Sequence, residues 1–130
     1  MNTVDAVLLE VIRLAQLTNP FATIKIGALP VANSISMAMS GGAMIDRYLD
    51  KGATYRVVCV LNGKHEDQQL LSETLNKIHE NLTQKKSYTN LASAQITDIE
   101  TVSLPSKIDV EKGQFLYGSS LRIKFFYRKV

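Results

Sequence analysis

The sequence holds a single cysteine, Cys59, and no large excess of charge of either sign. One cysteine excludes an intrachain disulfide framework, which favours a reducing compartment. The 15 basic and 12 acidic side chains leave a net charge of +3. Proteins that bind nucleic acid usually present a dense basic face, and a net charge of +3 is too small to indicate one. Composition therefore gives no support to a protein that recognises DNA or RNA.

Long apolar runs are absent as well. No run approaches the roughly 20 residues that a membrane-spanning helix needs. The apolar stretch from Val4 to Leu17 is interrupted by Glu10 and Arg13. It lacks the basic start and the uninterrupted apolar centre of a signal peptide. We therefore expect a soluble cytoplasmic protein without a membrane partner.

The chain length of 130 residues favours one domain with its own core, over residues 1–130. Near the N-terminus, apolar residues recur at helical spacing and predict a helix over Thr3–Leu17, which Asn19-Pro20 ends. The residues of its first face are Val4, Val7, Leu8, Val11 and Ala15. A second apolar face leaves little polar surface, so this helix is either central in the fold or covered by a partner.

The next 45 residues or so read as short strands. Alternating residues predict a strand over Phe21–Leu29. Two further strands are expected at Ser34–Met39 and Met44–Leu49, with a turn at Gly41-Gly42 between them. Asp50-Lys51-Gly52 is a second turn. A strand from Ala53 to Leu61 then ends at Asn62-Gly63, and its apolar run predicts that both of its faces are covered.

A charged amphipathic helix is predicted over Glu66–Thr83. Its core stripe consists of Leu71, Leu75, Ile78 and Leu82. Glu66 and Asp67 in its first turn, and Lys85-Lys86 beyond its last, complement the helix dipole.

The remaining chain predicts a strand over Ala94–Leu104, a polar loop over Pro105–Gly113 and a final strand over Phe115–Val130. Gly118-Ser119-Ser120 predicts a bulge in that last strand. Together these elements predict an α+β fold, in which two helices pack on a small, mixed and mostly antiparallel sheet.

No residue pattern indicates catalysis, a cofactor or a metal. Cys59 lies in an apolar strand, where a buried and inert thiol is expected. His65 and His79 have no metal-ligand spacing, and His79 is expected to be half-exposed on its helix. Asp98 and Glu100 share one strand face and more simply solvate the outer side of a sheet. We therefore expect no enzyme activity.

One segment, Tyr55 to Tyr88, resembles a known family. The strand Tyr55-Arg56-Val57-Val58-Cys59-Val60 leads into the helix Gln69-Leu70-Leu71-Ser72-Glu73-Thr74-Leu75-Asn76-Lys77-Ile78, which exits through Leu82-Thr83-Gln84-Lys85-Lys86-Ser87-Tyr88. This unit, the element order and the chain length are similar to the minor capsid, tail completion and tail terminator proteins of long-tailed bacteriophages.

The resemblance implies a structural protein of the virion neck or tail, assembled in the host bacterial cytoplasm. Copies of the chain would form a ring, a hexamer, at the head-proximal end of the tail tube. The ring would end tube polymerisation and join the tail to the head connector, and DNA would pass through its bore without specific recognition. The partners would thus be further copies, the tail tube protein and the head-closure or connector protein.

A ring brings one surface of each copy against a different surface of the next. We expect its contacts in the Ser/Met/Gly segment and in the basic C-terminal strand. The candidate interface residues are Met37, Met39, Met44, Arg122, Lys124 and Arg128. Methionines supply adaptable apolar contacts, and the basic residues would meet acidic groups of the neighbour or of the tube protein.

Two other functions stay open. The first is a head-closure or head–tail joining protein, which shares size and composition with a tail terminator. The second is a monomeric bacterial binding module, which would carry a concave pocket with converging polar groups.

Overall fold

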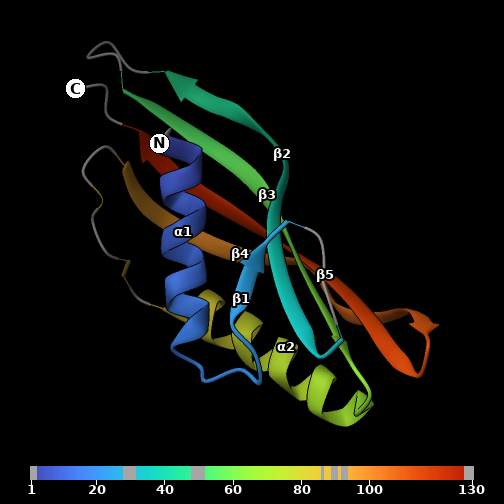
Figure 1. Ribbon diagram of the computed structural model, residues 1–130. Coiled ribbons are helices and arrows are strands. Elements are labelled where there is room, and N and C mark those ends of the chain that lie inside the picture. The colour runs from blue at the N-terminus through green and yellow to red at the C-terminus, as the bar shows by residue number, and fades with distance from the viewer. Residues whose placement is uncertain are drawn as a thin grey trace.

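The computed structural model describes residues 3–27, 32–47, 52–85, 87–88, 91 and 94–127, with residues 3 and 43–47 described by their backbone alone. These residues form α1 (Thr3–Gln16), β1 (Ile24–Ile26), β2 (Ser34–Arg47), β3 (Ala53–His65), α2 (Gln68–Thr83), β4 (Ala94–Glu111) and β5 (Gln114–Tyr127). The strands form one sheet in the order β1-β2-β3-β5-β4. β1 is parallel to β2, and the other neighbouring pairs are antiparallel. The predicted α+β fold, with two helices packed on a mixed and mostly antiparallel sheet, is confirmed (Figure 1).

Helix α1 follows the predicted spacing and stops one residue before its predicted end. Its buried face consists of Val7, Leu8, Val11, Leu14 and Ala15. Past the last turn, the Thr18 hydroxyl donates to the Ala15 carbonyl, and Asn19 takes a left-handed φ of 56°. Leu9, on the second apolar face, is 40% exposed. The helix therefore covers the sheet with one face and leaves part of the other on the surface.

Helix α2 begins two residues later than predicted, at Gln68. Asp67 is its N-cap, and the Oδ1 atom of this residue accepts a hydrogen bond from the Leu70 N–H over 3.1 Å. Asp67 thus acts from the cap position, not from the first turn. The predicted core stripe is confirmed, because Leu71, Leu75, Ile78 and Leu82 are fully buried. α2 packs on β3, β4 and β5.

Strand β2 joins two segments that the sequence predicts as separate strands. The predicted turn at Gly41-Gly42 is wrong, since both glycines pair with β3 and a bulge precedes them between Met39 and Gly41. A Cβ atom at Gly42 would lie 2.7 Å from the Arg56 carbonyl oxygen. Glycine is required there by the close approach of two strands. β1 is shorter than the predicted strand, and residues 28–29 and 48–49 of the predicted strands lie outside the described part of the chain.

Strand β3 runs straight through the predicted break at Asn62-Gly63 and ends at His65. A Cβ atom at Gly63 would lie 2.6 Å from the Leu71 Cδ1 atom. This glycine therefore lets α2 approach the strand closely. The expectation of two covered faces holds for one face only: the odd-numbered residues of the run are buried, whereas Val58 and Val60 are half-buried.

The predicted loop over Pro105–Gly113 is also wrong. β4 continues to Glu111, and only Lys112 and Gly113 turn the chain, with φ of 50° and 80°. β4 shows four register shifts against β5, and in each the extra residues lie on β4. One shift lies opposite the bulge predicted at Gly118–Ser120, so β5 is regular there and its partner is irregular. Pro105 is tolerated because it lies in one of these bulges on an edge strand.

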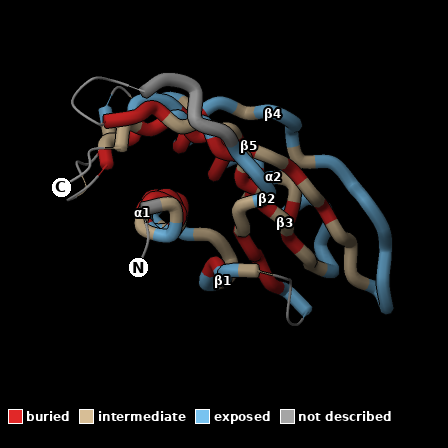
Figure 2. Tube along the Cα trace, turned by 90° about the horizontal axis from the view of Figure 1, so that it is seen from above, coloured by how far each residue is buried: buried red, intermediate tan, exposed pale blue. Residues whose placement is uncertain are grey.

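The core lies between the helices and one face of the sheet. Alternate residues of β5 face it, namely Tyr117, Ser119, Leu121, Ile123 and Phe125, all buried. Seen from above, the sheet curves, and α1 lies on its concave side (Figure 2). The opposite face is uncovered by either helix and carries the basic side chains of β3 and β5.

Candidate assembly surface

A histidine is buried in the core where α2 crosses the sheet. His79 is 2% exposed, so the expectation of a half-exposed histidine is wrong. Its Nδ1 atom lies 2.9 Å from the Thr101 Oγ1 atom, and its Nε2 atom lies 2.8 Å from the Ser119 Oγ atom. The Ser119 hydroxyl in turn donates to the Leu61 carbonyl over 2.8 Å. Helix spacing places His79 beside the core stripe. It does not predict the two hydroxyl partners, because these come from the distant strands β4 and β5.

These contacts fix the tautomer of His79. Ser119 has one hydroxyl hydrogen and donates it to Leu61, so its oxygen accepts from the Nε2–H group. The Nδ1 atom is then an acceptor for the Thr101 hydroxyl. Burial lowers the pKa of His79 to about 4. A neutral, hydrogen-bonded imidazole beside a serine that is 6% exposed serves the core and offers no base to a substrate.

The other polar candidates do not assemble into a reactive site. Cys59 is fully buried, and burial raises the pKa of its thiol to about 12. In the described part of the chain, no three His, Cys, Asp or Glu residues are grouped so that they could hold a metal ion. A shallow depression of about 730 Å³ at the start of α2 is lined mostly by exposed polar side chains, including Glu66, Asp67 and Glu73.

No helix among the described residues is long and apolar enough to cross a membrane.

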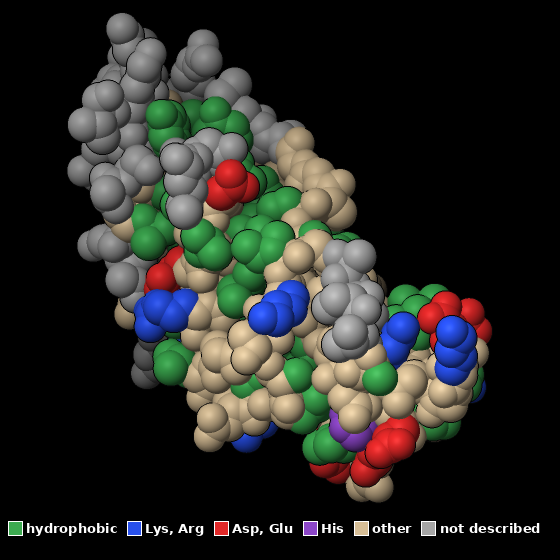
Figure 3. All heavy atoms as spheres, viewed as in Figure 1, with side chains coloured by type: hydrophobic (Ala, Val, Ile, Leu, Met, Phe, Trp, Pro, Cys, Tyr) green, Lys and Arg blue, Asp and Glu red, His purple; other side chains and the backbone are tan. Residues whose placement is uncertain are grey.

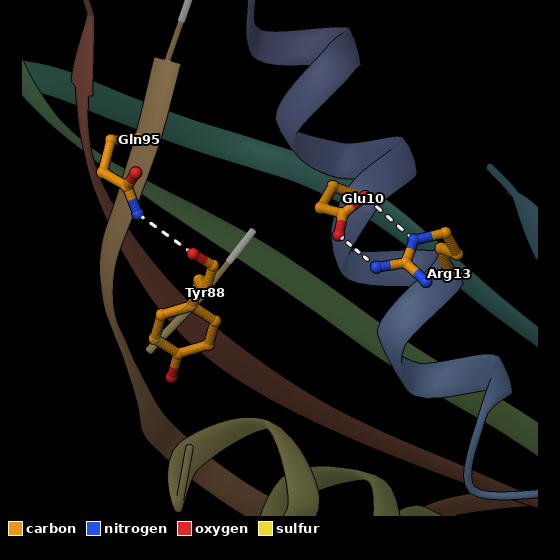
Figure 4. A network of polar contacts seen from close by, with 4 residues as sticks. All are labelled: Glu10, Arg13, Tyr88 and Gln95. Carbon is orange, nitrogen blue, oxygen red and sulfur yellow. Dashed lines mark hydrogen bonds and ion pairs between the residues drawn. The ribbon is translucent and has the colours of Figure 1, made fainter. Parts of the chain in front are cut away.

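Figure 4 shows two polar contacts, one within α1 and one between Tyr88 and β4. On α1, Arg13 donates to both Glu10 carboxylate oxygens, over 2.6 Å and 3.0 Å. Glu10 is buried and Arg13 is exposed, so the guanidinium faces outward. Ahead of β4, the Tyr88 carbonyl accepts from Gln95 over 3.2 Å, and the Tyr88 hydroxyl donates to the Leu82 carbonyl. Burial, and then the charge of Asp98, raises the pKa of Tyr88.

The predicted interface residues are spread over three environments. Met37 is fully buried against the helices, because it is on the core face of β2, and it cannot contribute to a surface. Met39 is half-buried, Lys124 is exposed and Arg122 is half-buried. The side chain of Met44 and the whole of Arg128 lie outside the described residues.

Arg122 and Lys124 lie on an interior strand. β5 is flanked by β3 and β4, so the backbone of the basic C-terminal strand is paired on both sides. Arg122 lies across from Glu100, and Lys124 from Asp98, which are both exposed as expected. The two basic residues and the two acids thus share the uncovered face of the sheet.

The clearest surface feature was not predicted from the sequence. Four apolar side chains of β4 are exposed: Val102 (48%), Leu104 (67%), Ile108 (62%) and Val110 (47%). We call them the β4 patch. Isolated exposed apolar residues are ordinary, whereas four on one edge strand form a candidate contact surface. The period-two pattern that reveals a strand was hidden here by Pro105 and the bulges.

Comparison with known proteins supports the fold and little more. No protein-family model matches the sequence, and no curated protein does. Among solved structures, the chain is similar to a chain of the "Virion of native gene transfer agent (GTA) particle", with a TM-score of 0.55 and 12% sequence identity. The match covers 91% of this chain and 90% of that chain. The two chains therefore share a fold over nearly their whole lengths.

Proposed function

We propose that this chain is a structural protein of a phage-like particle. The observation that carries the proposal is the end-to-end likeness of its fold to a chain of a gene transfer agent virion. A shared fold alone does not define a function. Two features of the described residues agree with the proposal: the buried polar groups serve the core, and the exposed apolar row on β4 suits assembly.

Within the particle, we assign the chain to a ring, a hexamer, at the head-proximal end of the tail tube. The ring ends tube polymerisation and joins the tail to the head. Its function is binding, not catalysis, and it needs no cofactor, metal or membrane. Its partners are further copies, the tube protein and the head connector, and DNA passes through the bore without specific recognition. Support comes from the resemblance of the Tyr55–Tyr88 unit to tail completion proteins.

Of the predicted contact residues, we retain Met39, Arg122 and Lys124 as residues that contact a partner in the ring. Lys124 and Arg122 lie on the sheet face that no helix covers, within reach of a docking protein. Their charge suits acidic groups of the tube protein or of a neighbouring copy. Met39 lies on the other face of the sheet, across from Cys59, where its half-buried, adaptable side chain packs against the core.

The test is to delete the coding sequence in the phage or prophage that carries it and to image the particles. Loss of a tail terminator should give tubes of uncontrolled length that are not attached to heads. The wild-type chain supplied in trans should restore tails of uniform length. Normal particles in the deletion strain would contradict the proposal.

The same images separate the second candidate within the particle. A head-closure or joining protein predicts tails of normal length lying free beside heads that have lost their DNA. Purified chain added to such tails and heads would show which of the two it binds. Binding to the end of the tube supports the tail terminator role, and binding to the head supports head closure.

A further inference from the structure

We draw no further inference here: the strongest candidate, the β4 patch on the edge of the sheet, where hydrophobic side chains lie among charged ones at the β4–β5 hairpin (Figure 3), carries none because nothing in the described part of the chain shows what covers it.

Discussion

The Nε2 atom of His79 lies 2.8 Å from the Oγ atom of Ser119 and joins α2 to β5 inside the core. Thr101 completes the contact from β4. One side chain therefore satisfies polar groups of three elements. The contact is also a source of pH dependence, because the imidazole must stay neutral.

We expect the chain to lose stability as the pH falls from about 6.5 towards 4. Burial lowers the pKa of His79 from 6.5 to about 4, so in this window the unfolded chain binds a proton that the folded chain does not. The stabilisation is complete above the unfolded value and declines below it. The loss is up to roughly 3 kcal/mol, since each pKa unit corresponds to about 1.4 kcal/mol.

Urea unfolding measured across this pH range checks the expectation. His79→Gln should be less stable at neutral pH and should show a flatter dependence below it. His65→Gln is the matched control, because it removes the other histidine and leaves the buried imidazole in place. An unchanged slope in His79→Gln would contradict the assignment.

Leu75→Ala should destabilise the fold by about 2–5 kcal/mol, the usual cost of such a cavity at a buried site. Leu75 is fully buried in the α2 stripe. Chemical denaturation gives the free energy of unfolding. Lys77→Ala, exposed on the same helix, should change it by less than about 0.5 kcal/mol. Equal effects of the two substitutions would show that the helix is rotated from the position described.

Gly42→Ala should also destabilise, by about 1–3 kcal/mol, the usual cost of overpacking. The added Cβ atom would lie 2.7 Å from the Arg56 carbonyl oxygen and 2.9 Å from the Val57 Cα atom, both backbone atoms of β3. β2 must then move away from β3. The neighbouring Ser40→Ala, at an exposed position, serves as the control in thermal unfolding. If Gly42→Ala melts with the wild type, the two strands are further apart than the structure shows.

Cys59 should not react with a maleimide in the folded protein. The thiol is fully buried, so the reagent cannot reach it. Burial also raises its pKa to about 12, so the reactive thiolate does not form at neutral pH. Mass spectrometry should find complete labelling after the protein is unfolded in urea. Rapid labelling of the native protein would place this residue at the surface.

Reversing the charge of Arg122 and Lys124 together should preserve folding and impair tail joining. Both side chains lie on the uncovered face of the sheet, on an interior strand whose opposite face is in the core. Complementation of the deletion strain measures the effect, and Lys77→Glu is a control on the exposed side of α2. Normal tails from the double variant at moderate salt would exclude these residues from the surface.

The sequence predicts the elements of this fold better than their ends. α1, the α2 stripe and the final strand follow from local spacing, and the structure confirms them. Gly41-Gly42, Asn62-Gly63 and Pro105 read as breaks because such residues usually turn a chain. Here each is held in a strand by contacts from distant residues, which no local pattern encodes.

The candidate surface was harder to predict, for the same reason. Strand order decides which strand lies at an edge, and the sequence does not reveal that β5 enters between β3 and β4. The sequence predicts a strand that includes Met37 but does not show which face of that strand lies in the core. In the structure, Met37 pairs with the buried Leu61 of β3, on the face of the sheet that the helices cover.

The bulges of β4 have a consequence for how this chain can change over generations. β4 uses 18 residues along a partner strand of 14. A residue gained or lost in β3 would invert every side chain beyond it, from core to surface, because that strand is paired on both sides. In β4, the same event could be absorbed by making or removing a bulge. The outer rim of the sheet can therefore drift in length and sequence, and adapt to a new partner, while the interior stays as it is.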